Sequence, residues 1–291
     1  MSLSQCLICQ HSQLESIPYP GKNQSDQLHF REILICSQCG HGTAGPARDQ
    51  AELDDFYENG TYWDGSVNPE LMAHNNIQAQ FRVQLAARSF SKEHPIRVLD
   101  IGAGFGQTGL WLQKQMGDQL NYYTVEPDPG LQKHIKSQLS YSYGGNFKSL
   151  EDVKGLYDLI FLNHVLEHVA DPRDFLSKVI NLLSKKGKLY VETPNRDYRF
   201  KDNVFPHTQF FSPKSFGLLG KSLKVTTDHI KTFGDHFPDQ NIWKRRILSR
   251  LFRWSIRLSL PPIQRLVNHM MWRYRHNHSQ GIWLRWLISH K

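Results

Sequence analysis

The sequence has few cysteines, no long apolar run and, after Asp239, no acidic residue. No uninterrupted apolar run reaches the ~20 residues that a membrane-spanning helix needs. The first ten residues have neither a basic start nor a long apolar stretch, so they do not resemble a secretory signal. These absences argue against a membrane-spanning or secreted protein, and we expect a cytoplasmic location.

Charge is divided unevenly along the chain. The 291 residues carry a formal net charge of +8, and residues 240–291 contain eleven Lys and Arg with no Asp or Glu. Residues 1–239 are therefore slightly acidic, with 24 basic and 27 acidic side chains. At 39% apolar and 12% aromatic content, the chain is long enough for one α/β domain and a smaller unit.

All the cysteines lie near the N-terminus, in two CxxC pairs with 26 residues between them. Two pairs of thiolates on tight turns supply the tetrahedral set that structural zinc prefers. Two disulfides or a redox-active pair are the alternatives, and the absence of a secretory signal disfavours disulfides. We therefore predict a zinc module over residues 1–45 with no open metal position for catalysis. Its ligands are Cys6, Cys9, Cys36 and Cys39.

A glycine-rich turn follows an apolar segment that ends at Ile101. Such an apolar segment is typical of a strand buried on both faces, and residues 107–116 read as the helix that follows. Twenty residues after the turn, a second expected strand ends in Glu126, where a carboxylate can accept both hydroxyls of a ribose. The layout predicts a nucleotide-type cofactor site. It lacks the third glycine of the dinucleotide-binding pattern, which argues against a dehydrogenase.

The segments VLDIGAGFG and VEPD resemble the class I S-adenosylmethionine (SAM) methyltransferases over roughly residues 75–230. The resemblance implies a Rossmann-like seven-stranded α/β fold and SAM as cofactor. The stretch NHVLEHVADP resembles methyltransferases that act on quinones and sugars, which implies that Asn163 and His164 lie beside the methionine end of SAM. Glu167 and His168 have two interpretations, as polar residues at a helix start or as substrate contacts. The predicted cofactor contacts are Asp100, Gly102, Gly104, Gly106, Glu126, Asp128, Asn163 and His164.

A four-cysteine module before a SAM domain resembles the nucleotide-sugar C-methyltransferases. Their Tyr-rich linker is similar to residues 56–63 here, which makes Tyr57 and Tyr62 either substrate contacts or packing aromatics. Residues 205–213 resemble the family's EHxxYFS segment, with His207 on its histidine and Pro206 in place of its glutamate. That replacement, and the lack of a long second C-terminal lobe, count against carbon methylation. Since a histidine near neutral pH can serve as base, His207 and His164 are the catalytic candidates.

We divide the chain into four regions: the zinc module 1–45, a linker and helix 46–94, the SAM-binding domain 95–232 and a basic, helical tail 233–291. The helix of the linker has Leu71, Ile77, Phe81 and Leu85 spaced to bury one face. Strands and helices alternate through the SAM-binding domain, which predicts a parallel sheet covered by helices on both faces. The expected elements are 97–101, 107–116, 122–125, 130–138, 156–162, 172–183, 188–192, 213–221 and 224–229.

The tail repeats tryptophan and arginine at helical spacing. A basic amphipathic helix with tryptophan is suited to an anionic membrane surface, to nucleic acid or to packing on its own domain. Nucleic acid is the weakest of the three, because the rest of the chain is slightly acidic. A membrane role would place the protein at the inner face of the membrane and would suit a lipid-linked acceptor. The apolar positions are Trp243, Ile247, Leu251, Trp254 and Leu258, and the basic ones are Arg246, Arg250, Arg253 and Arg257.

The leading hypothesis is a SAM-dependent methyltransferase that acts on a sugar, glycan or related small hydroxylated acceptor. An RNA methyltransferase would explain zinc together with basic charge, and its RNA binding would be sensitive to salt. A non-catalytic SAM-fold scaffold would bind partners through the zinc module and the tail. The sequence leaves the acceptor and the oligomeric state open.

Overall fold

The computed structural model describes residues 3–21, 25, 27–58, 69–88, 90, 94–139, 142–236, 247, 250, 251, 254, 266 and 281–289. Its α-helices are α1 (Gln50–Glu58), α2 (Pro69–Ala86), α3 (Gln107–Met116), α4 (Pro129–Gln138), α5 (Pro172–Ile180) and α6 (Pro213–Ser222). Its strands are β1 (Leu14–Pro18), β2 (Glu32–Cys36), β3 (Gly42–Gly45), β4 (Ile96–Ile101), β5 (Leu120–Val125), β6 (Tyr143–Phe147), β7 (Tyr157–Asn163), β8 (Leu183–Pro194), β9 (Gln209–Phe210), β10 (Thr226–His236) and β11 (Gly281–Ser289). The 3₁₀ helices η1, η2 and η3 span Gly117–Gln119, Leu166–His168 and Asp197–Arg199.

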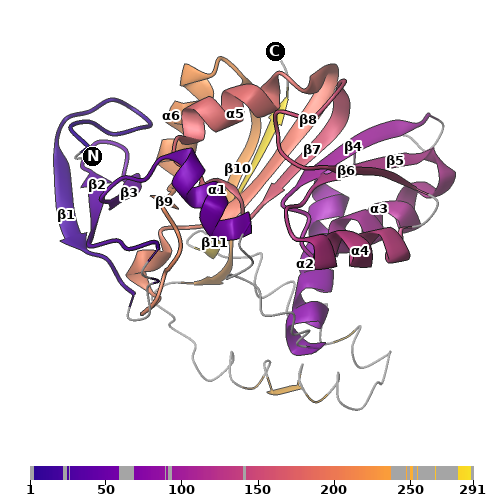
Figure 1. Ribbon diagram of the computed structural model, residues 1–291, viewed down its shortest axis with the longest axis horizontal. Helices are drawn as coiled ribbons and strands as arrows, with labels where there is room; N and C mark the ends of the chain where they lie inside the picture. The colour runs from indigo at the N-terminus through magenta and orange to yellow at the C-terminus, as the bar shows by residue number, and fades with distance from the viewer. Residues whose placement is uncertain are drawn as a thin grey trace.

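The main sheet has seven strands in the order β10-β11-β8-β7-β4-β5-β6. Neighbours from β8 to β6 are parallel, whereas β11 is antiparallel to both β8 and β10 (Figure 1). Because β4 lies between β5 and β7, the loops after these strands meet at one carboxyl edge. This sheet confirms the predicted seven-stranded fold, but the expected elements did not include two of its strands, β6 and the antiparallel β11.

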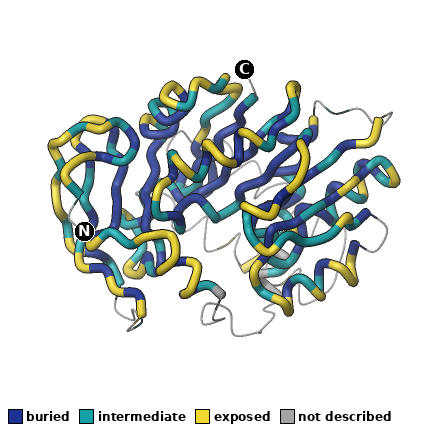
Figure 2. Tube along the Cα trace, turned by 45° about the horizontal axis from the view of Figure 1, so that its top comes forward, coloured by how far each residue is buried: buried dark blue, intermediate teal, exposed yellow. Residues whose placement is uncertain are grey.

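Apolar side chains cover both faces of the sheet, so its strands are mostly buried in Figure 2. One core joins the sheet to α5 and α6, and the other joins it to α2, α3 and α4. The prediction of which α2 residues are buried is partly wrong. The helix buries Ala79, Val83 and Ala86, and it also buries the polar residues Gln78 and Arg82.

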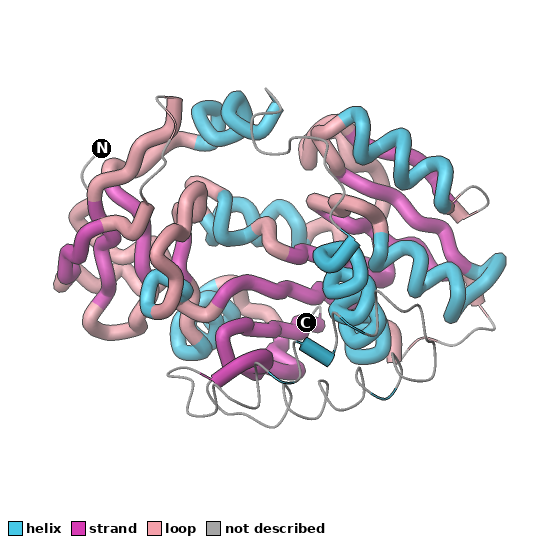
Figure 3. The backbone as a smooth tube through the Cα atoms, turned by 90° about the horizontal axis from the view of Figure 1, so that it is seen from below, coloured by secondary structure: helices cyan, strands magenta, loops and turns pink. Residues whose placement is uncertain are grey.

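The N-terminal module forms a second sheet in the order β1-β2-β3-β9, so its fourth strand comes from residues 209–210. It lies at the opposite end of the molecule from α3 and α4 (Figures 1 and 3). The hydroxyl of Ser212 donates to the Cys39 carbonyl over 2.8 Å, and Cys6, Ile8 and Cys36 join the same core as α5 and α6. The predicted boundary at residue 45 therefore does not separate two independent cores.

The predicted helical tail needs a correction at both ends: residues 233–236 are the end of β10, and residues 281–289 are also a strand. Residues 281–289 form β11, which pairs with β10 on one side and β8 on the other. Trp286 is fully buried there and stacks on Phe216 at a centroid distance of 4.9 Å. Within the part of the tail that the structure describes, Ile247, Leu251 and Trp254 are helical as expected.

Some expectations lie outside the described residues. They concern Tyr62, Trp243, Leu258, and the arginines at 246, 253 and 257. Among the described residues, no helix combines the length and apolar character required to span a membrane.

Candidate functional site

The glycine-rich turn between β4 and α3 has the conformation that its sequence predicts. Gly102, Gly104 and Gly106 all have positive φ, and the Gly102 amide donates to the Val125 carbonyl over 2.7 Å. A Cβ on Gly102 would lie 2.5 Å from Cγ2 of Val165, whereas one on Gly104 would meet no atom within 4 Å. The N-terminus of α3 has no side-chain cap. Its amide groups and the open side of Gly104 therefore form a cradle suited to an anionic group.

Glu126 follows β5 and faces this turn. Its carboxylate accepts the Gly104 amide at 2.8 Å and the Asp128 amide at 3.1 Å. Burial raises the pKa of Glu126 to about 7, against the effect of these two hydrogen bonds. Asp128 itself caps α4 by accepting the Leu131 amide. Asn146, which the sequence analysis missed, accepts the Glu126 amide at 2.9 Å and so fixes the end of β5.

Asp100 and Asn163 lie side by side at the ends of β4 and β7. The Asp100 carboxylate accepts the Tyr122 hydroxyl at 2.6 Å and the Asn163 amide group at 3.4 Å. Burial raises the pKa of Asp100 to about 6. The side-chain oxygen of Asn163 is buried and has no hydrogen-bond partner. It is therefore free to accept a donor from a bound ligand, such as an ammonium group.

His164 has φ of 58° and lies between two buried carboxylates. Its Nδ1 is 3.1 Å from Glu167, and its Nε2 is 3.6 Å from Glu192. Although burial opposes charging, these carboxylates raise the pKa of His164 to about 9. A histidine that is already protonated at neutral pH donates hydrogen bonds. The geometry thus argues against the predicted role of His164 as a base.

Glu192, at the end of β8, connects His164 to two buried arginines that the sequence analysis missed. Arg82 from α2 lies 2.8 Å from one carboxylate oxygen, and Nε of Arg285 from β11 lies 3.0 Å from the other. Burial opposes ionisation of Glu192, but the two guanidinium groups hold its pKa well below the usual value. Trp283 of β11 contacts His164 directly, at a ring distance of 4.9 Å. The pairing of β11 with β8 brings Arg285 and Trp283 into this group, whereas Arg82 reaches Glu192 from α2.

A second group of side chains comes from three distant segments. The hydroxyl of Tyr57 in α1 makes a 2.6 Å hydrogen bond with Nδ1 of His168 in η2. The His168 and His207 rings lie 4.9 Å apart in an edge-on arrangement. Burial and the neighbouring His207 lower the pKa of His168 to about 3, so His168 is neutral at pH 7. Tyr57 and His207, both singled out in the sequence, thus reach one site through His168.

His207 has a carboxylate partner despite the proline at position 206. Its Nδ1 lies 3.0 Å from Oδ2 of Asp197, which also pairs with Lys201 at 2.9 Å. Burial opposes ionisation of Asp197, but His207 and Lys201 keep its pKa below the usual value. The chain lacks the Glu–His pair of the family's segment, as predicted from Pro206, and has an Asp–His pair instead. Asp197 gave no sequence signal, because it lies ten residues from the histidine.

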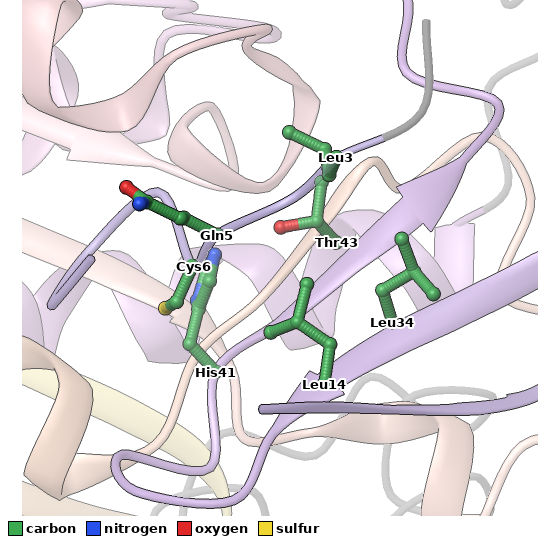
Figure 4. Close-up of a pocket in the computed structure, with 7 residues that line it drawn as sticks. All are labelled: Leu3, Gln5, Cys6, Leu14, Leu34, His41 and Thr43. Atoms are coloured by element: carbon green, nitrogen blue, oxygen red, sulfur yellow. The ribbon is translucent and has the colours of Figure 1, made fainter. Parts of the chain in front are cut away.

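The four cysteines form the cluster that their spacing predicts. Cys6 and Cys39 have sulfurs 3.6 Å apart, and those of Cys9 and Cys36 are 3.5 Å apart. A disulfide has an S–S distance of about 2.05 Å, whereas a tetrahedral zinc with Zn–S bonds of about 2.3 Å places its sulfurs about 3.8 Å apart. The cluster is thus compatible with zinc. Figure 4 shows Cys6 beside His41 in a pocket lined by Leu3, Gln5, Cys6, Leu14, Leu34, His41 and Thr43.

A second set of ligand atoms, from Glu167, His168 and His207, lies within 4.8 Å of one another. One oxygen of Glu167 lies 3.1 Å from Nδ1 of His164. Tyr57 occupies one nitrogen of His168, and Asp197 lies beside one nitrogen of His207. The set therefore forms a compact polar site.

Comparison with known proteins extends these observations. Residues 72–237 match a family described as "Methyltransferase domain". A curated relative from Nitrobacter winogradskyi, named ubiquinone biosynthesis O-methyltransferase, is 28% identical over 180 residues, which cover 56% of this chain and 67% of the relative. A relative of the same name from Xanthomonas euvesicatoria is 29% identical over 160 residues, which cover 50% of this chain and 62% of that protein. The match thus spans about two thirds of the length of these relatives.

Solved structures share the fold at low identity. The [4+2]-cyclase SpnF aligns with a TM-score of 0.54 at 10% identity, over 84% of this chain and 97% of its own. Coclaurine N-methyltransferase, solved with N-methylheliamine and SAH, aligns with a TM-score of 0.50 at 16% identity, over 72% of each chain. Together with the family match and the glycine-rich turn, they show that this chain belongs to the methyltransferase-domain family and is a SAM-dependent methyltransferase with the class I fold.

Proposed function

We propose that the protein transfers a methyl group to a hydroxyl of a small acceptor, such as a sugar or a glycan unit. Two observations support an oxygen acceptor. The curated relatives carry the name O-methyltransferase, and a polar site with two histidines lies at the same edge of the sheet as the glycine-rich turn. The zinc-module resemblance to nucleotide-sugar enzymes supports a sugar-like acceptor.

We assign the cofactor half of the proposed site to the glycine-rich turn, Glu126, Asn163 and Asp100. Glu126 would accept the ribose hydroxyls, and the uncapped start of α3 would receive the carboxylate of SAM. Asn163 offers its unpartnered oxygen to the amino group. Asp100 holds Tyr122 and Asn163 in place. Bound SAM supplies a methyl group on a sulfonium, which is activated for in-line displacement.

The acceptor half of the proposed site consists of Tyr57, His168, His207 and Asp197. It supplies the base that takes up the proton of the methyl acceptor. As the acceptor oxygen forms its bond to the methyl carbon, the carbon–sulfur bond breaks and its electron pair goes to sulfur. The hydroxyl proton goes to His207, and the charged Asp197 beside it stabilises the resulting imidazolium. Tyr57 and the neutral His168 orient the acceptor by hydrogen bonds. The single observation that carries the proposal is this juxtaposition of His207 with Asp197 and His168.

We also propose a structural zinc on the four cysteines. The sulfur separations fit a tetrahedral ion, and four protein ligands leave no site for a substrate. Since β3 of this module pairs with β9, which follows His207 by two residues, the zinc would hold the acceptor half in shape.

The test compares cells that lack the protein with cells that express the wild type or His207→Asn. The cells are grown on methyl-labelled methionine, and their small molecules and glycans are analysed by mass spectrometry. We expect a labelled, ether-cleavable methyl group that requires the wild type, and a ~10²–10⁴-fold slower transfer by His207→Asn, the range for loss of a general base. His29→Asn, at an exposed histidine of the module, is the matched control.

Two results would contradict the proposal. A labelled methyl group that resists ether cleavage would show transfer to carbon, and a label found in RNA alone would show a different acceptor class. Unchanged transfer by His207→Asn, with unchanged SAM affinity, would remove His207 from the proton-transfer role.

A further inference from the structure

The segment between β10 and β11 begins and ends at the carboxyl edge of the sheet. Strand β8 runs parallel to β7 and ends at Pro194, which pairs with Trp283 near the start of β11. At the end of β10, His236 pairs with Gly281. Both described ends of the segment therefore lie at the edge that carries His164 and the acceptor half.

The composition of this segment differs from that of the rest of the chain. Residues 237–280 contain nine Lys and Arg, one Asp and no Glu, together with three tryptophans. Trp283 and Trp286, which the sequence analysis counted in the same tail, belong instead to the sheet. The positive charge of the chain is therefore concentrated between two adjacent strands.

The described residues of this segment expose an apolar row. Ile247, Leu251 and Trp254 are helical and 55%, 40% and 53% exposed, and their spacing of four and three residues places them on one helix face. Arg250 is also helical and exposed. Of the five large apolar side chains that are exposed in the described part of the chain, only Leu156 lies outside this segment. A solvent-facing concentration of this kind marks an interaction surface.

We propose that this helix face inserts into an anionic lipid surface. The apolar row with tryptophan suits the boundary between headgroups and acyl chains, and the basic residues complement anionic headgroups. Nucleic acid would account for the arginines but not for a row of exposed Ile, Leu and Trp. A single apolar row amid nine basic residues also favours a charged lipid surface over an apolar protein groove.

Because residues 237–280 start at the edge of the sheet that carries the site, lipid binding would also bring the site close to the membrane. Ten residues, or eleven steps along the chain, separate His236 from Ile247, so the apolar row begins at most about 40 Å from the edge of the sheet. Binding through this row holds the acceptor half near the membrane, where it would meet an acceptor with a lipid anchor. This last step rests on the proposed function; the lipid binding itself does not.

The test is co-sedimentation of the full chain with vesicles of phosphatidylcholine, with and without phosphatidylglycerol. We expect binding only to the anionic vesicles, and a partial loss at high salt because screening leaves apolar insertion intact. The triple variant Ile247→Ser, Leu251→Ser, Trp254→Ala should bind at least about tenfold more weakly with unchanged SAM affinity. Leu156→Ser, at the exposed apolar residue elsewhere, should bind like the wild type.

Three outcomes would overturn the proposal: no binding to anionic vesicles at low salt, undiminished binding by the triple variant, or a concentration-dependent dimer that the triple variant abolishes in the absence of lipid binding. The vesicle assay contains no acceptor. Lipid binding without a hydroxylated methyl acceptor would therefore refute the proposed function alone, and the reverse result would refute the lipid surface alone.

Discussion

The two halves of the site are assembled in different ways. In the cofactor half, the glycine-rich turn, Glu126 and Asn163 lie at the ends of β4, β5 and β7, which are neighbours in the sheet, and its hydrogen bonds join residues at most 63 positions apart. In the acceptor half, the Tyr57–His168 bond joins residues 111 positions apart. The Arg82–Glu192 pair spans 110 positions. A site at the ends of neighbouring strands leaves a recognisable motif after each strand in the sequence. Contacts between distant segments leave no such motif.

The largest expected loss of stability comes from the strand at residues 281–289, and little loss is expected from residues 240–278 of the same predicted tail. Deleting residues 281–289 removes the strand between β8 and β10, including Leu284, Trp286 and Ile288, which are fully buried. At ~1.5–3 kcal/mol for each buried side chain, this loss approaches the ~5–15 kcal/mol that stabilise a typical domain. We expect no cooperative transition in urea. Replacing residues 240–278 with a short Gly-Ser linker should retain the transition, and an equal loss in both deletions would contradict the assignment of β11 to the core.

The loss of zinc should affect a smaller part of the molecule. Structural zinc supplies about 10–16 kcal/mol of apparent binding free energy in zinc-finger peptides, so Cys36→Ser should lose the metal and expose residues 1–45 to protease. SAM affinity should persist, because the cofactor half is built from other strands. Elemental analysis and limited proteolysis measure both effects, with the neighbouring exposed Ser37→Ala as control. Wild-type protein purified without chelator that contains no zinc would refute the metal assignment.

The buried charge of Glu192, beside His164, gives a smaller effect. Glu192→Gln leaves the guanidinium groups of Arg82 and Arg285 without their carboxylate, which should lower the free energy of unfolding by about 3–5 kcal/mol. The control is Lys188→Gln on the same strand, whose ion pair with Asp228 is part-exposed and should contribute below about 1 kcal/mol. Urea denaturation measures both. Similar losses in the two variants would show that Glu192 does not organise the site.

The smallest effect tests the cofactor half. Glu126→Ala should weaken SAM binding by about 1.5–3 kcal/mol, the range for a hydrogen bond to a charged group. In the free protein burial raises the pKa of Glu126 to about 7, so its contribution to folding is largest below its unfolded value and is lost as the pH rises through 7. SAM binding has the opposite dependence, because the ribose requires the carboxylate.

Calorimetry checks this dependence directly. Between pH 8 and pH 6, SAM affinity of the wild type should fall about tenfold, as expected for a group of pKa about 7. Glu126→Gln should show no such fall. A wild-type affinity that is constant over this range, or an Ala variant that binds SAM normally, would exclude the ribose assignment.

Much of the fold could be predicted because its signals are local. The helix at 107–116 was predicted with the observed bounds, since a glycine turn precedes it and Gly117 ends it. Strand β11 was missed for a physical reason. Both of its faces are buried, so its apolar residues do not alternate with polar ones, and periodicity cannot distinguish it from a helix.

The residues of the candidate site likewise fall into those that the sequence predicts and those that it does not. The glycines, Glu126 and the cysteine cluster could be read from spacing alone, and the structure places them as expected. Arg82 and Arg285 could not be predicted, because nothing in the sequence distinguishes a buried arginine from an exposed one until its carboxylate partner is known. The same holds for Asp197, whose pairing with His207 depends on how residues 195–211 return to the sheet.

The order of strands in the sheet has a consequence for synthesis on the ribosome. Strand β10 is complete at His236, but its neighbour β11 follows only after 44 further residues, which take about 2–9 s to translate at typical rates. During that interval β8 and β10 both present unpaired edges, which invite pairing with other chains. Until residues 281–289 emerge, the sheet therefore cannot close at this position.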